Sequence, residues 1–283
     1  MIILSTSVAV VFNTALGQYD NHERTFNLDQ IFFHSDFEKS TVINYLNGNN
    51  SNMLELLLAS GQQIDFPTAN EYQTSFKEFI NDLKLKKERF NKTNKFLEYL
   101  FFKVHKKFLK HYENYVTVEK LFEKRNYDCV VGSAFYALVL DEFEFDYHII
   151  ETNYHMFIML EADDVTYLLE STDPLNGYVQ GIDKVMKRID GIKQREREIE
   201  AANNNSDIFT YKYIIHKDID LRQLVGLQYF NQATIAYNKS NFEEAINCVQ
   251  KGRLFYDSKR MKEMMKLIVH SYQGLAAKNT DQE

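Results

Sequence analysis

The stretch that decides the fold reads YDCVVGSAFY and covers residues 127–136. Its composition predicts an apolar helix from Cys129 to Phe143, with Gly132 and Ala137 as small positions where another element packs closely. A thiol at a helix N-terminus lies at the positive end of the helix dipole, which lowers the thiol pKa. The stretch therefore predicts that Cys129 is a reactive cysteine whose pKa lies below that of a free thiol.

Three strand-like runs follow this helix, at residues 145–151, 154–161 and 165–171. The turn formed by Asp163 and Asp164 between the last two runs predicts an antiparallel hairpin. His155 lies on the second run and Glu170 on the third, so an imidazole and a carboxylate are expected on neighbouring strands. A carboxylate can orient an imidazole, and a nearby imidazolium lowers the pKa of a thiol. Together, these residue types predict a nucleophilic cysteine site.

Three short blocks in this part of the chain resemble the transglutaminase-like superfamily, whose fold is related to that of papain-type peptidases. Residues 126–129 resemble its cysteine block, residues 153–157 its histidine block, and residues 167–172 its acidic block, with glutamate in place of aspartate. The blocks occur in the family's order, on a helix and then on two strands. Bacterial relatives of this group also combine such a domain with tetratricopeptide repeats.

The resemblance implies a role for each of the three residues. Cys129 would be the nucleophile, His155 the base, and Glu170 the acid that orients the imidazole. Asp173, three residues further on, is the alternative third member. We expect Glu170 to contact His155, because on a strand Glu170 shares a face with Leu168, whereas Asp173 lies beyond the strand end. The resemblance implies no cofactor and no metal.

The last part of the chain has the spacing of a tetratricopeptide repeat. Tyr229, Ala233 and Ala236 fall at positions typical of the repeat, as do Phe242 and Ala245 in the next helix. A generic helical hairpin is the alternative interpretation. One and a half repeats are too few for an independent solenoid, so we expect three helices that pack on the preceding domain. Phe242 and Ala245 are expected to be buried where two of these helices cross.

The whole chain is therefore expected to have an α+β fold. Residues 19–125 form a helical region, residues 126–216 a transglutaminase-like domain with an antiparallel sheet, and residues 217–283 a tetratricopeptide-like tail. Residues 1–18 are apolar and end in small residues, which is typical of a secretory signal peptide; a buried N-terminal strand or a mis-assigned start are the alternatives. The protein is expected to be bacterial, and periplasmic or secreted if this segment is a signal peptide; otherwise it is cytoplasmic.

Composition limits the classes of partner. Of the 283 residues, 45% are hydrophobic and 26% are charged, which is ordinary for a globular protein. The net charge of −7 disfavours nucleic acid, because a phosphate-binding surface needs concentrated positive charge. The apolar N-terminal segment is too short to span a bilayer, so no stable membrane insertion of the mature chain is expected. Cys248 falls on an apolar helix stripe and is expected to be a buried structural residue.

Two functions fit these residues. The first is cysteine-dependent acyl chemistry on a protein or peptide, by amide hydrolysis or acyl transfer. Cys129 would attack an amide carbonyl, His155 would protonate the leaving amine, and water or an amine would resolve the thioester. The second is a non-catalytic scaffold of the same fold that binds a protein or peptide partner through its helical tail. Catalysis requires the Cys129 sulfur near a ring nitrogen of His155, with a cleft open above both.

Overall fold

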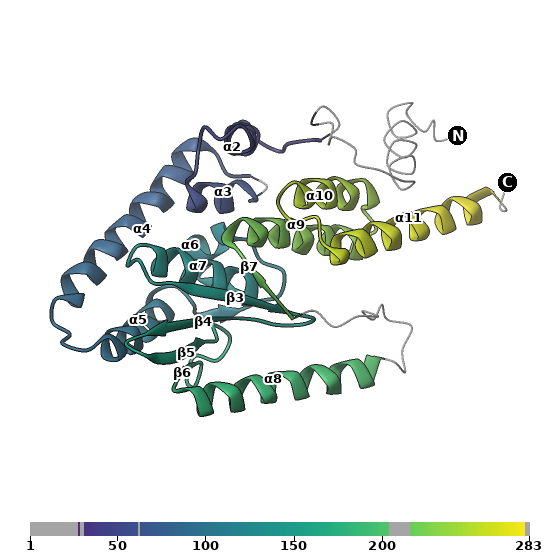
Figure 1. Cartoon of the computed structure of the whole chain (residues 1–283). Helices are drawn as coiled ribbons and strands as arrows, with labels where there is room; N and C mark the ends of the chain where they lie inside the picture. The colour runs from purple at the N-terminus through teal and green to yellow at the C-terminus, as the bar shows by residue number, and fades with distance from the viewer. Residues whose placement is uncertain (1–27, 29–30, 62, 204–215, 281–283) are drawn as a thin grey trace.

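The computed structural model describes residues 28, 31–61, 63–203 and 216–280. Within these residues the chain has an α+β fold, with ten helices, a five-stranded antiparallel sheet and a separate two-stranded pair. Helices lie above and below the sheet in Figure 1. The expected signal peptide, residues 1–18, lies outside the described residues.

The N-terminal region is helical, as predicted. Its helices are α2 (Asp36–Leu46), α3 (Met53–Ala59), α4 (Phe66–Lys87), α5 (Thr93–Lys107) and α6 (Val118–Lys124). Asp65 caps α4 by accepting the N–H of Thr68 at 2.9 Å, and Pro67 lies in the first turn, where its missing N–H costs no helical bond. The ring centroid of Phe108 lies 4.5 Å from that of Phe135, so this region packs directly on the cysteine helix.

The five-stranded sheet consists of β3 (Tyr147–Thr152), β4 (Met156–Ala162), β5 (Val165–Leu169), β6 (Tyr178–Gln180) and β7 (His216–Ile219). The strand order is β6-β5-β4-β3-β7, and β4 and β5 form the predicted hairpin. Asp163 and Asp164 have φ values of 51° and 58° in its turn, the left-handed backbone that tight hairpins require. The sequence did not predict β6 or β7. Because β7 crosses the boundary expected after residue 216, the sheet extends into the segment assigned to the tail.

The sheet lies between two helices, α7 (Cys129–Asp141) and α8 (Ile182–Asn203). Ile158 and Leu169 are paired across β4 and β5 and belong to the main core on the α7 side. Phe157 and Leu168 belong to a second cluster, formed with buried side chains of α8. Successive side chains of a strand point to opposite faces, so the sheet separates the cysteine helix from α8.

The tail consists of α9 (Leu221–Asn238), α10 (Phe242–Phe255) and α11 (Lys259–Thr280), the three helices predicted. Phe242 and Ala245 are buried in one cluster with side chains of α9 and α11, which confirms their expected burial. Leu224 of α9 belongs to the main core, and a buried ion pair of 2.7 Å between Lys251 and Glu38 joins α10 to α2. The helical tail therefore packs on the rest of the chain, as we expected.

A parallel pair, β1 (His111–Tyr112) and β2 (Asn126–Tyr127), leads into the cysteine helix. The N–H of Glu113, directly after β1, donates to the carbonyl oxygen of Tyr127 at 2.9 Å. This bond holds the segment after β1 beside the residues that lead into α7.

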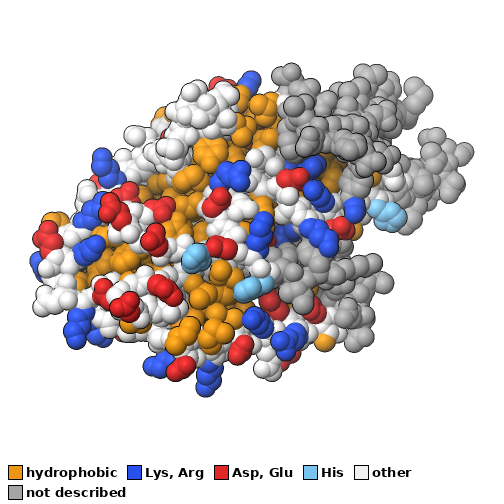
Figure 2. Space-filling view, viewed as in Figure 1, with side chains coloured by type: hydrophobic (Ala, Val, Ile, Leu, Met, Phe, Trp, Pro, Cys, Tyr) orange, Lys and Arg blue, Asp and Glu red, His pale blue; other side chains and the backbone are white. Residues whose placement is uncertain are grey.

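The face of the molecule in Figure 2 carries hydrophobic side chains across its middle, with acidic and basic side chains of both signs interspersed around them. None of the described helices combines the length and apolar character needed to cross a bilayer.

Candidate functional site

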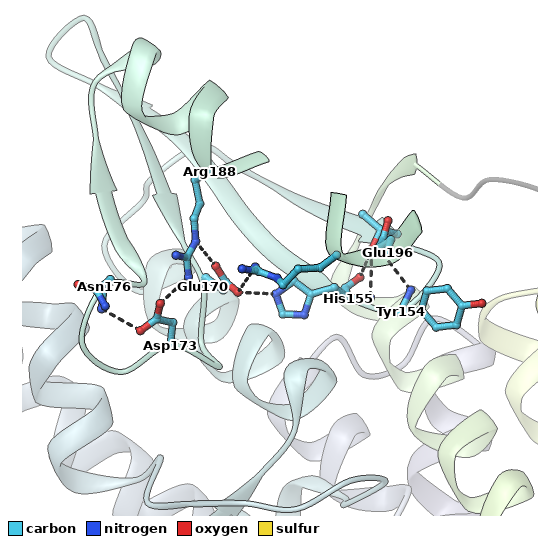
Figure 3. A network of polar contacts seen from close by, with 9 residues as sticks. Tyr154, His155, Glu170, Asp173, Asn176, Arg188 and Glu196 are labelled. Carbon is cyan, nitrogen blue, oxygen red and sulfur yellow. Dashed lines mark hydrogen bonds and ion pairs between the residues drawn. The ribbon is translucent and has the colours of Figure 1, made fainter. Parts of the chain in front are cut away.

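The histidine and the carboxylate predicted on neighbouring strands are in contact. The Nε2–H of His155 donates to Glu170 Oε1 at 2.9 Å, as Figure 3 shows. His155 directly precedes β4 and Glu170 directly follows β5, so the antiparallel pairing of these strands brings the two side chains together. The expected contact between Glu170 and His155 is therefore confirmed. Asp173 does not take this position.

Arginines of α8 surround the same carboxylate. Arg188 Nε donates to Glu170 Oε2 at 2.5 Å, and Arg195 lies 3.7 Å from Glu170 Oε1. Arg188 also donates to Asp173 Oδ2 at 2.6 Å. Asp173, the alternative to Glu170, is thus bonded to Arg188 instead of His155. Burial raises the pKa of Glu170, but the bonds from His155 and Arg188 outweigh it and hold the pKa below its usual value. Glu170 is therefore ionised at neutral pH.

The loop between β3 and β4 is held from two sides. Glu196 of α8 accepts the N–H of Tyr154 at 3.1 Å and the hydroxyl hydrogen of Thr152 (Figure 3). Arg260 of α11 donates to the carbonyl oxygens of Thr152 at 3.0 Å and Asn153 at 3.1 Å. The position of the loop that leads to the histidine thus depends on both α8 and the tail.

Cys129 begins α7, and the residue as a whole is partly exposed, although neighbouring atoms largely enclose its sulfur. Asp128 caps this helix, because its Oδ1 accepts the N–H of Val131 at 2.8 Å. Gly132 allows α7 to approach the residue that follows Glu170, since a Cβ at Gly132 would overlap Ser171. The small position predicted at Gly132 therefore has the close neighbour that we expected.

Cys129 and His155 belong to different faces of the sheet. His155 lies one residue before β4 and Glu170 one residue after β5. If the alternation of side chains continues to these positions, both point to the face of Phe157, which is covered by α8. The opposite face is covered by α7. Within the described part of the chain, no hydrogen bond joins the Cys129 sulfur to the imidazole. The structure thus brings His155 and Glu170 into direct contact, whereas Cys129 shares only the lining of a cleft with His155.

The electrostatics of Cys129 also differ from the expectation. Burial of the sulfur and the neighbouring Asp128 carboxylate raise the pKa of the thiol to about 12. Arg260 and the N–H groups at the start of the helix act in the opposite direction but do not compensate. The predicted lowering of the Cys129 pKa is therefore wrong. The helix-start position is visible in the sequence, whereas the desolvation of the sulfur comes from the tertiary packing around it.

The partners of Asp128 are neutral donors. Asn231 Nδ2 of α9 donates to Asp128 Oδ2 at 2.8 Å, and backbone N–H groups bond to the same carboxylate. Burial outweighs these hydrogen bonds and raises the pKa of Asp128 to about 7. A carboxyl group that is half protonated at neutral pH thus lies next to Cys129 in the chain.

A cleft of about 750 Å³ opens between the start of α7, the β3–β4 loop and helices α9 and α11; we call it the α7–α9 cleft. Cys129 and His155 both line it, and Phe230, Thr234 and Tyr237 of α9 line its other side. Its volume is within the range of ordinary ligand sites. The helical tail therefore forms one wall of a site that the sequence placed in the transglutaminase-like domain alone.

The other titratable candidates do not form a second centre of this kind. Among the described residues, no group of three or more histidine, cysteine, aspartate and glutamate side chains is placed to hold a metal ion. Cys248 is fully buried, as predicted, and burial raises its pKa well above the usual value. His105 packs on the ring of Phe101, and burial lowers its pKa to about 4.

Several residues of the site were missed at the level of sequence. Asp128 had a visible signal, because aspartate directly before a helix is a common N-cap. Arg188, Asn231 and Arg260 had none, since their contacts to Glu170, Asp128 and the β3–β4 loop depend on how separate elements pack.

Comparisons of this chain with protein-family models, with curated proteins and with solved structures gave no match. The interpretation of the site therefore rests on the geometry described above.

Proposed function

We propose that this protein binds a peptide segment of a partner protein in the α7–α9 cleft, on a transglutaminase-like scaffold. The observation that carries the proposal is that both parts of the chain build this cleft, α7 and the β3–β4 loop on one side and the tail on the other. Ligand sites are commonly concave and lined by apolar and aromatic side chains with a few polar groups. The resemblance of the cysteine, histidine and acidic blocks supports the scaffold, and the tetratricopeptide-like tail supports a peptide partner.

The state of Cys129 favours binding over chemistry. A thiol with a pKa near 12 is protonated at neutral pH, and the thiol is a much weaker nucleophile than the thiolate. Among the described residues that line the cleft, His155 carries the one imidazole, and it donates to Glu170 on the α8 side. These features favour a resting cleft that holds a partner without reacting with it.

The proposal can be tested by selecting binders from a displayed library of random peptides on the immobilised full chain. Selected peptides should bind with a measurable Kd and should lose about tenfold or more in affinity to the Thr234→Trp variant, which fills the cleft. Thr74→Trp on α4 is the matched control, because Thr74 and Thr234 are both helical and both donate their hydroxyl hydrogen to the carbonyl four residues earlier. An empty selection, or equal loss in both variants, would contradict binding in this cleft.

The second candidate is cysteine-dependent acyl chemistry, by hydrolysis or transfer, with Cys129 as nucleophile, His155 as base and Glu170 as orienting acid. One observation favours it: Cys129 and His155 line the same cleft, and His155 is bonded to the buried carboxylate of Glu170. Hydrogen bonds of catalytic groups are often absent or long in a free enzyme and form only with substrate. Closure of the cleft on a substrate would then have to bring the imidazole to the sulfur.

Acyl transfer to Cys129 can be observed directly. The full chain is incubated with p-nitrophenyl acetate, and the intact mass is followed by peptide mapping of the acetylated residue. Acetyl-Cys129 should form in the wild type, be absent in Cys129→Ser, and form about 10²-fold or more slowly in His155→Ala, the effect of losing a general base. Cys248, which is buried, serves as the internal control. Equal rates in wild type and His155→Ala would leave binding as the only function.

A further inference from the structure

The charged groups that line the α7–α9 cleft are already bonded to other protein groups. Asp128 accepts hydrogen bonds from the backbone N–H of Val131 and from the Asn231 amide, both at 2.8 Å. Glu151 accepts the hydroxyl hydrogen of Tyr256 at 2.6 Å and pairs with Arg260 at 3.2 Å. Both carboxylates therefore have their partners inside the protein.

The lining residues Arg260 and His155 are bonded inside the protein as well. Arg260 pairs with Glu151, donates to the carbonyl oxygens of Thr152 and Asn153, and lies 5.4 Å above the ring of Phe230. His155 donates to Glu170, which lies outside the cleft lining. A charged group of a ligand would thus enter a cleft in which Arg260 and Glu151 already form an ion pair and Asp128 is already bonded to neutral donors.

The remaining lining is aromatic, apolar or uncharged. Tyr112 and Tyr115 stand on one side with 54% and 42% of their surfaces exposed, although side chains of this size are usually more buried. Tyr237 of α9 and Leu267 of α11 line the tail side, together with Thr234 as an uncharged polar group. Exposed tyrosines that face an apolar wall are typical of peptide contacts, because a tyrosine ring gives a large contact area at low entropic cost.

We propose that the ligand of the α7–α9 cleft is an uncharged peptide segment with aromatic or aliphatic side chains, held between the Tyr112–Tyr115 loop and the wall formed by α9 and α11. An apolar side chain gains from leaving water there, whereas a buried charge without a counter-charge is strongly disfavoured. This inference rests on the proposed binding function and specifies its substrate class.

Capped pentapeptides that differ only in their central residue, Phe, Leu, Asp or Lys, provide the probe. Their Kd values are measured by calorimetry on the full chain carrying Cys129→Ser, so that no covalent step contributes. The Phe and Leu peptides should bind at least tenfold more tightly than the Asp and Lys peptides. Tighter binding of a charged peptide would overturn this inference alone. No binding of any of the four would overturn the inference together with the proposed peptide-binding function.

A lysine introduced on α9 tests whether the peptide lies against this helix. Thr234→Lys should shift the ratio of Kd values for the Phe and Asp peptides at least tenfold toward the Asp peptide, and the isosteric Thr234→Val should preserve the wild-type ratio. Asn238→Lys, at an exposed position of the cleft near the end of α9, gives the same test if Thr234→Lys does not fold. An unchanged ratio in a folded lysine variant would show that the peptide does not lie against α9.

Discussion

Two buried carboxylates, Glu170 and Asp128, belong to opposite sides of the candidate site, and their pKa values move in opposite directions. Glu170 accepts from the Arg188 guanidinium at 2.5 Å and from the imidazole of His155 at 2.9 Å, and its pKa is lowered. Asp128 is bonded to backbone N–H groups and to the Asn231 amide, and its pKa rises to about 7. Hydrogen bonds from neutral groups do not offset the loss of hydration of a buried charge, whereas adjacent cations do. At neutral pH, the Glu170 carboxylate beside His155 is therefore ionised, whereas the Asp128 carboxyl group beside Cys129 is partly protonated.

The largest effect is expected from Glu170→Gln, which keeps the shape of the side chain and removes its charge. Arg188 would then keep only Asp173 as an anionic partner, and His155 would keep at most a neutral amide oxygen as acceptor. Losing one member of a buried ion pair typically costs about 3–5 kcal/mol. Urea unfolding at pH 7 should show a loss of this order.

Unfolding measured at lower pH provides the control for the Glu170→Gln prediction. Because the folded pKa of Glu170 is lowered, its stabilisation is present above the unfolded pKa, about 4.3, and is lost as the pH falls through the folded value. The difference in unfolding free energy between wild type and Glu170→Gln should therefore shrink below pH 4. A difference that is independent of pH would contradict the assigned role of the charge.

Asp128→Asn should give the opposite result. Its folded pKa is raised, so the favourable contribution of the protonated form is present below the unfolded pKa, about 3.9, and is lost as the pH rises through about 7. The stability of Asp128→Asn relative to wild type should therefore increase between pH 4 and pH 8, by at most about 4 kcal/mol for a shift of about three units. Unfolding curves at pH 5 and pH 8 measure this difference. A relative loss of stability at pH 8 would show that a cation compensates Asp128.

Asn231→Leu removes the hydrogen bond from α9 of the tail to the Asp128 carboxylate, next to Cys129. The Asp128 carboxylate would lose a donor at 2.8 Å, and an unsatisfied buried charge of this kind costs about 1–3 kcal/mol. The loss should be larger at pH 8, where Asp128 is mostly ionised, than at pH 5. Equal losses at both pH values would assign the effect to packing of α9 alone.

The smallest effect concerns the reactivity of Cys129. Iodoacetamide should label it slowly at pH 8, because burial and Asp128 raise its pKa to about 12. Asp128→Asn removes the negative neighbour, and a reduction of one pKa unit would increase the thiolate fraction and the labelling rate about tenfold. Labelling is followed by mass spectrometry with the buried Cys248 as reference. Rapid labelling of the wild type near pH 7 would instead support an activated thiol.

The order of helices and strands around the site was predictable because the patterns that indicate each element lie within a few residues of one another in the sequence. Asp163 and Asp164 marked the β4–β5 hairpin, and the Phe242 and Ala245 pattern marked buried positions of the tail. β7 was missed because four residues, three of them exposed, carry too little periodicity to indicate a strand. Tertiary pairing with β3 makes it part of the sheet.

The amino-acid sequence by itself determined the α+β class, the thiol at the start of a buried helix, and the contact between Glu170 and His155, because short-range periodicity and strand register decide these features. Only the tertiary structure decided the charge state of Cys129, the face on which His155 lies, and the wall that the tail adds to the cleft. Asn231 is 103 residues from Asp128, yet bonds to it. Desolvation and charge depend on all neighbours in space, and no local pattern in the chain encodes them.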